Sequence, residues 1–183
     1  MKKFPVITAL LSVLIFMLCG CETVPSFSGK SEVSEIMIPL SQPDLEFSIP
    51  QSFSETSTEN NNKAYIFNNA SIIINEDKLN EAVPNLTEYV KYSKELYRSA
   101  TDKYTQISEE ETTVNGLDAV ITEFVYEING ESDILSMQCI VGFLYDASEN
   151  PEKVYIVTCK SDSESYPNYK QGFLNTINSV KLK

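Results

Sequence analysis

The sequence predicts an α+β domain in which a mainly antiparallel sheet lies between two helical layers. Two late segments, residues 132–146 and 153–161, have apolar side chains at both odd and even positions, which is typical of strands buried on both faces. Residues 77–101 and 164–183 carry apolar side chains at steps of three and four, the spacing of amphipathic helices. One helix on each side of the sheet would therefore give an α-β-α sandwich.

The first half of the domain alternates strand and turn signals. Residues 45–53 alternate apolar and polar side chains up to Pro50, which predicts a strand with one buried face that ends at the proline. Residues 54–63 are polar without periodicity and are expected to form a loop. Residues 64–76 contain two apolar runs separated by Asn68-Asn69, which indicates a hairpin.

The main part of the first helix is expected to begin after Pro84. Asn85 and Glu88, three residues further on, resemble a capping box there. A short helical turn is expected before it, around residues 78–83. Its tyrosines could form a stripe for stacking a ligand, but Tyr at helical spacing more often belongs to a core. We favour the core for this set: Tyr89, Tyr92 and Tyr97.

The second half predicts two hairpins and a helix. Asn115-Gly116 separates strands over residues 105–114 and 117–128, and Asn129-Gly130 marks the next turn. The closing helix should pack on the sheet through one apolar face. The residues of this apolar face are Tyr166, Tyr169, Phe173, Ile177 and Val180.

The N-terminus has the pattern of a bacterial lipoprotein signal. Two lysines precede an apolar run that ends near Leu18, which is shorter than the roughly 20 residues of a membrane-spanning helix. Residues 18–21, Leu-Cys-Gly-Cys, resemble a lipobox. Cys21, with the small Gly20 before it, is the expected diacylglyceryl site, whereas Cys19 follows bulky residues and would leave with the signal.

These features divide the chain into three parts. Residues 1–20 are the expected lipoprotein signal peptide, residues 21–42 the lipidated cysteine and a Ser-rich flexible tether, and residues 43–183 a single folded domain. One acyl chain anchors a protein only marginally, so a diacyl group would make the attachment durable.

Cys139 and Cys159 are candidates for a structural disulfide. A hairpin centred on residue 149 would place them opposite each other on neighbouring strands, at a separation close to what a disulfide needs. The alternative is two buried free thiols. A register shift of one residue would move the two side chains to opposite faces of the sheet.

Composition excludes several classes of function. The chain has 14 basic and 26 acidic residues with no basic cluster, which argues against nucleic acid as a partner. It has no histidine, which excludes His-based zinc sites and Ser-His-Asp triads. We therefore assign no catalytic residues, no metal ligands and no cofactor, and expect the protein not to be an enzyme. The acidic runs at residues 109–111 and 146–152 are interpreted as solvated edge charges rather than a cation site.

Four short elements, taken in order, resemble the PsbP-like superfamily, which includes photosystem II extrinsic protein P and DcrB-type bacterial lipoproteins. They are Ile49-Pro50 after a strand, Asn115-Gly116 with Ala119 in a hairpin, Tyr166 with Tyr169 in a helix, and Asn178-Ser179 at its end. Val180 stands where such proteins usually have Phe, and Phe53 where Trp is common, but both positions stay apolar. The resemblance implies an α-β-α binding or assembly module and brings no catalytic residues.

The combined expectation is a non-enzymatic lipoprotein on the outer face of the bacterial cell membrane that contacts a protein partner in the cell envelope. An exposed sheet edge, or the loop at residues 147–153, would supply the contacts. The alternative is a small-molecule or ion-binding lipoprotein associated with a transporter. An apolar pocket lined by several tyrosines would favour it: Tyr89, Tyr97, Tyr126 and Tyr155. A hydrolase that uses two carboxylates is a more distant third.

Overall fold

The computed structural model describes residues 36–57, 63–130, 133–149 and 151–183. Within them, neighbouring strands are antiparallel and form two sheets. The three-stranded sheet has the order β1-β2-β10, and the seven-stranded sheet has the order β3-β4-β5-β9-β8-β7-β6. The strands are β1 (Met37–Ser41), β2 (Leu45–Pro50), β3 (Ser54–Ser57), β4 (Lys63–Phe67), β5 (Ala70–Lys78), β6 (Lys103–Val114), β7 (Leu117–Asn129), β8 (Ile134–Tyr145), β9 (Lys153–Asp162) and β10 (Lys181–Leu182).

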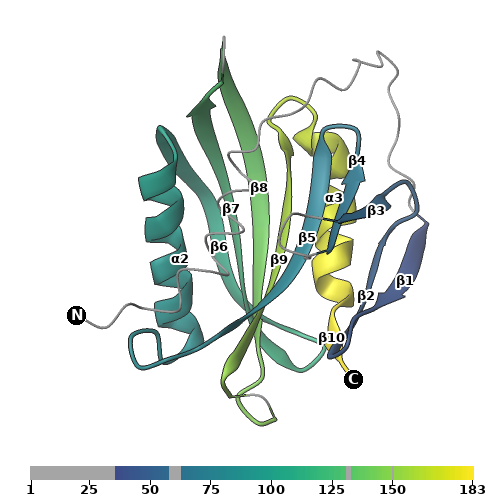
Figure 1. The fold of residues 1–183 in the computed structure, drawn as a ribbon, viewed down its shortest axis with the longest axis vertical. Coiled ribbons are helices and arrows are strands. Elements are labelled where there is room, and N and C mark those ends of the chain that lie inside the picture. Colours follow the sequence, from purple (N-terminus) through teal and green to yellow (C-terminus); the bar gives the residue numbers. More distant parts are fainter. Residues whose placement is uncertain (1–35, 58–62, 131–132, 150) are drawn as a thin grey trace.

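The two helices cover opposite faces of the large sheet (Figure 1). Helix α2 (Leu86–Ala100) packs on one face, and α3 (Tyr166–Ser179) packs on the other together with the small sheet. Asn85 caps α2 as predicted, because its side-chain oxygen accepts a hydrogen bond from the backbone N–H of Glu88. The predicted α+β sandwich is confirmed.

The central strands β8 and β9 divide the core into two layers. Successive side chains of a strand point to opposite faces, so Val141 and Phe143 of β8 join the layer under α2, while Ile140 and Leu144 join the layer under α3. All four are at most 2% exposed. Apolar residues at both parities therefore signal a strand buried on both faces, as expected for these segments.

Gly142 of β8 lies at a point where α3 approaches the sheet closely. A Cβ atom at this position would lie 2.7 Å from Cγ2 of Ile177, closer than carbon atoms pack. Because glycine has no side chain, the helix lies lower on the sheet here than any other residue would permit.

The end of α3 is held by the side chain of Asn115 and by that of its own last residue, Ser179. The Asn115 amide nitrogen donates to the carbonyl oxygens of Asn178 at 2.9 Å and Val180 at 2.8 Å. Asn115 occupies a tight turn with φ of 49°, followed by Gly116 with φ of 90°, as a type I′ hairpin requires. Ser179 Oγ accepts a hydrogen bond from the backbone N–H of Ser48 at 2.8 Å. Helix α3, the β6–β7 turn and β2 therefore meet at one junction.

Three expectations about local structure are wrong. Residues 78–83 contain no helical turn but a single bridge between Asn80 and Val83. Residues 54–63 were expected to form a polar loop, but the first four of them form the short edge strand β3. The domain also begins earlier than residue 43, because β1 pairs with β2 along its whole length. In the part of the chain that the structure describes, neither helix is long and apolar enough to cross a bilayer.

Candidate interaction surface

The predicted pairing of the two late cysteines is wrong by one residue of register. Cys139 of β8 faces Lys160 of β9, and Cys159 faces Ile140. The side chains consequently lie on opposite faces of the sheet, Cys139 in the layer under α2 and Cys159 in the layer under α3. Both are free thiols with no exposed surface, which is the alternative that the sequence left open.

These thiols are expected to be chemically inert in the folded protein. Burial raises the pKa of Cys139 to about 12 and that of Cys159 well above its ordinary value of 9.0, so neither forms the reactive thiolate near neutral pH. In a Cys19→Ala/Cys21→Ala variant, we expect almost no reaction with a thiol reagent at pH 8 and two reactive thiols after denaturation. Because the raised pKa belongs to the folded state alone, stability should fall as the pH rises above 9.

Rapid labelling of two thiols in the folded variant would contradict this burial, and absence of labelling both before and after denaturation would indicate a disulfide instead. The other predicted cysteine site, the lipidation of Cys21, lies outside the described residues and stays a prediction.

The tyrosine stripe of α2 belongs to the core or its edge, as favoured from the sequence: Tyr89 and Tyr97 are buried, and Tyr92 is partly buried against the same layer. The four tyrosines considered as the lining of a pocket are also core residues. Tyr89, Tyr97 and Tyr126 are at most 3% exposed and pack under α2, whereas Tyr155 is fully buried in the opposite layer. The Tyr89 hydroxyl donates to Asp77 Oδ2 at 2.8 Å; burial and this carboxylate raise its pKa. Because the sheet separates the two groups, these four tyrosines line no common pocket.

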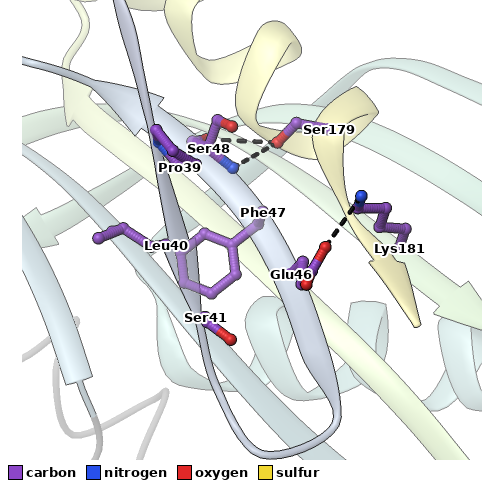
Figure 2. A pocket seen from close by; sticks show the side chains of 8 residues that line it. All are labelled: Pro39, Leu40, Ser41, Glu46, Phe47, Ser48, Ser179 and Lys181. Carbon is purple, nitrogen blue, oxygen red and sulfur yellow. Dashed lines mark hydrogen bonds and ion pairs between the residues drawn. The ribbon is translucent and has the colours of Figure 1, made fainter. Parts of the chain in front are cut away.

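A surface hollow of about 310 Å³ lies on the small sheet (Figure 2). Its two charged side chains are paired with each other, since Lys181 forms an ion pair with Glu46 at 2.9 Å, and the Ser179 hydroxyl hydrogen-bonds the backbone of Ser48. Such internal pairing leaves few groups directed at a ligand. The lining consists of Pro39, Leu40, Ser41, Glu46, Phe47, Ser48, Ser179 and Lys181.

A buried carboxylate ties α3 to the sheet. Glu123 of β7 is 4% exposed and accepts hydrogen bonds from Lys170 Nζ at 2.8 Å and Gln138 Nε2 at 2.8 Å. Burial and the nearby Glu123 charge raise the pKa of Tyr166. The carboxylate is thus ion-paired and hydrogen-bonded, an arrangement that holds the helix to the sheet. Sequence analysis missed Glu123, although it shares the inward-facing parity of Leu117, Ala119 and Ile121.

The acidic run at residues 109–111 lies on β6, an edge strand of the large sheet, which agrees with edge charges. Glu109 forms an ion pair with Lys94 of α2 at 2.6 Å. Glu110 and Glu111 are exposed, and within the described residues neither forms an ion pair. A bulge in the pairing with β7 leaves Ile107 50% exposed beside them.

Two further expectations concern loops and metals. In the loop at residues 146–149, Asp146 Oδ1 accepts hydrogen bonds from the Ser148 hydroxyl and from the backbone N–H groups of Ser148 and Glu149, and these bonds lower the pKa of Asp146. This geometry shapes a turn in which Ala147, Ser148 and Glu149 are exposed. Among the described residues, no group of three His, Cys, Asp or Glu side chains is placed to hold a metal ion.

Two helices on opposite faces of this antiparallel sheet, closed by a small sheet along α3, define the PsbP-like fold. The chain has this fold, since CyanoP, the cyanobacterial PsbP of Synechocystis sp. PCC 6803, matches it with a TM-score of 0.61 over 87% of this chain and 99% of CyanoP, at 10% identity. No protein-family model and no curated protein sequence matches the chain.

Two further solved structures share the architecture. LpqN, described as involved in cell envelope biogenesis of Mycobacterium tuberculosis, has a TM-score of 0.59 at 7% identity, over 81% of this chain and 91% of LpqN. The Ran-binding protein Mog1p of Saccharomyces cerevisiae has a TM-score of 0.56 at 11% identity, over 80% of this chain and 95% of Mog1p. At these identities the likeness extends to the fold alone.

Proposed function

We propose that this protein is a bacterial lipoprotein, anchored through Cys21 to the outer face of the cell membrane, that acts by binding a protein partner in the cell envelope. The observation that carries the binding role is the β6 edge, a twelve-residue strand paired on one side only. Side chains fill the core layer on each face of the large sheet. Recognition therefore takes place on the outer surface of the domain.

Two of the structural neighbours support this role. LpqN is described as acting in cell envelope biogenesis and Mog1p as binding Ran. A Ser-rich tether after the lipid would let the domain search a small volume above the membrane, which raises its effective concentration for a membrane-bound partner. The absence of histidine and the ion pair of Glu123 with Lys170 support a role without catalysis.

The test is photo-cross-linking of the full chain in its own membrane. A photoreactive residue is placed in turn at exposed positions on different faces, namely Glu111 on β6, Asp118 on β7 and Gln171 on α3. The proposal expects one dominant protein adduct, reduced strongly when Cys21→Ala removes the anchor. Absence of an adduct at every position, or an adduct unaffected by Cys21→Ala, would contradict binding at the membrane.

A second candidate, small-molecule or ion binding in support of a transporter, rests on the hollow of Figure 2. Thermal-shift screening of small molecules tests it, with Glu46→Gln/Lys181→Gln as the variant that should abolish any stabilisation. This double change removes both charges of the ion pair and so leaves neither unpaired.

A further inference from the structure

The outer edge of β6 presents a continuous set of backbone hydrogen-bonding groups. Strand β6, which follows α2 in Figure 1, hydrogen-bonds to β7 alone. Val114 and Leu117 flank the two-residue turn and form the first pair of the hairpin. In such hairpins the hydrogen-bonded pairs alternate with non-bonded ones, so alternate residues direct their N–H and C=O groups outward. Those residues are Glu109, Glu111 and Thr113.

No described element covers these outward groups. Backbone hydrogen bonds outside the helices and ladders involve none of the three residues within the described part of the chain. Helix α2 reaches β6 over one face of the sheet, through Lys94 to Glu109, and leaves the edge itself open. An open edge of this length can accept one added strand, because a peptide strand satisfies the unpaired groups in register.

The side chains along this edge favour a particular kind of strand. Glu109, Glu110 and Glu111 alternate between the two faces, so three successive residues of an added strand would each lie beside one carboxylate. Ile107, which is 50% exposed in the bulge, follows towards the start of β6. An exposed isoleucine does not help to protect an edge from pairing, whereas it would pack against an apolar residue of a partner.

The same charges disfavour a second copy of this chain as the partner. Two β6 edges paired with each other would bring the glutamates of one copy close to those of the other, and like charges on adjacent strands repel. The chain as a whole has a formal net charge of −12, which attracts a basic partner and repels a copy of itself.

From the open edge, its length and its charge, we infer that β6 binds an extended segment of a partner protein, which adds as a further strand to the seven-stranded sheet. The segment carries three successive basic residues beside Glu109–Glu111 and an apolar residue beside Ile107. This inference rests on the proposed function and names the surface and the chemistry of the partner.

The test uses the full chain in uncharged detergent micelles and a ten-residue peptide of alternating threonine and valine with three central lysines. We expect the peptide to slow amide hydrogen exchange in β6 at the outward residues, and its affinity to fall as salt is added. Glu110→Lys/Glu111→Lys should weaken binding by about tenfold or more. The matched control is Glu81→Lys/Glu152→Lys, which changes the net charge equally at exposed positions elsewhere and should bind nearly as the unchanged protein does.

A second pair of variants separates strand addition from attraction of charges alone. Thr113→Pro removes one outward N–H without changing any charge, whereas Thr113→Val keeps it. Proline is tolerated on the open side of an edge strand, so both variants should fold. Binding should weaken several-fold in Thr113→Pro only. Equal binding by the two variants, or by the two double-lysine variants, would overturn the inference, as would protection confined to segments outside β6.

Failure of this inference differs from failure of the proposed function. If the peptide does not bind while cross-linking yields an anchor-dependent adduct from Asp118 or Gln171, the protein binds its partner through another face. If no position yields an adduct, the proposed function itself fails.

Discussion

Replacing Phe173 with alanine is expected to lower the free energy of unfolding by about 3–5 kcal/mol, the usual cost of deleting a buried aromatic ring. Phe173 of α3 has no exposed surface. Its ring centroid lies 6.3 Å from that of Phe53, 6.0 Å from Tyr166 and 5.9 Å from Tyr169. The surrounding rings come from the helix and from the segment after β2, so they cannot all move to fill the space.

Urea denaturation followed by circular dichroism measures this effect as a shift in midpoint at unchanged slope. The matched control is Gln171→Ala, an exposed position on the same helix, which should change stability by less than about 0.5 kcal/mol. Equal midpoints for the two variants would show that α3 does not pack on the sheet through Phe173.

Gly142→Ala is expected to destabilise the protein by about 1–3 kcal/mol, the range for an overfilled core. The added methyl group would meet Ile177 Cγ2 at 2.7 Å, and the β-branched Ile177 side chain has little freedom to turn away. Helix α3 would have to rise from the sheet, which loosens the contacts on either side of the glycine.

A double-mutant cycle identifies the cause of this loss. Ile177→Ala alone should be destabilising because it leaves a cavity, but adding Gly142→Ala to it should cost little more, since the clash is gone. Unfolding free energies that are simply additive would show that the two residues do not interact. A stabilising Gly142→Ala would show that the glycine acts only through chain entropy.

The central strands and both helices could be predicted because each carries a periodic pattern long enough to be specific. Strands β8 and β9 are apolar at both parities, and α2 and α3 each repeat an apolar face over several turns. The short edge strands β1 and β3 could not be predicted, because five and four residues are too few to show a hydrophobic pattern. Their pairing with β2 and β4 determines their conformation instead.

The register between β8 and β9 could not be predicted from the sequence for a different reason. A hairpin centred on residue 149 and one centred half a residue later give equally regular ladders, yet they differ in which face each side chain takes. The structure pairs Cys139 with Lys160, and the loop between β8 and β9 contains nothing in its sequence that would have selected this register. The disulfide prediction therefore depended on a turn whose geometry the residues did not determine.

The elements that resemble the PsbP-like superfamily are each unspecific, and the structure shows why their order was informative. The turn at Asn115-Gly116 caps the end of α3, Ser179 holds β2, and Tyr169 packs against Phe53 after Ile49-Pro50. Elements that are far apart in the sequence are thus in contact in the fold. The β6 edge had no such signature, because solvated glutamates on a strand look alike whether or not a partner adds beside them.

If the chain is exported as proposed, the junction at the end of α3 also bears on when the domain can fold. Ser48 and Ser179 are 131 residues apart in sequence, and β10 completes the small sheet beside β2. A chain that emerges from a translocation channel in the N-to-C direction cannot close this sheet until residue 182 is through. Non-local closure of this kind is slow because the entropy of a long loop must be overcome first. During that interval β2 is paired with β1 alone and keeps one open edge.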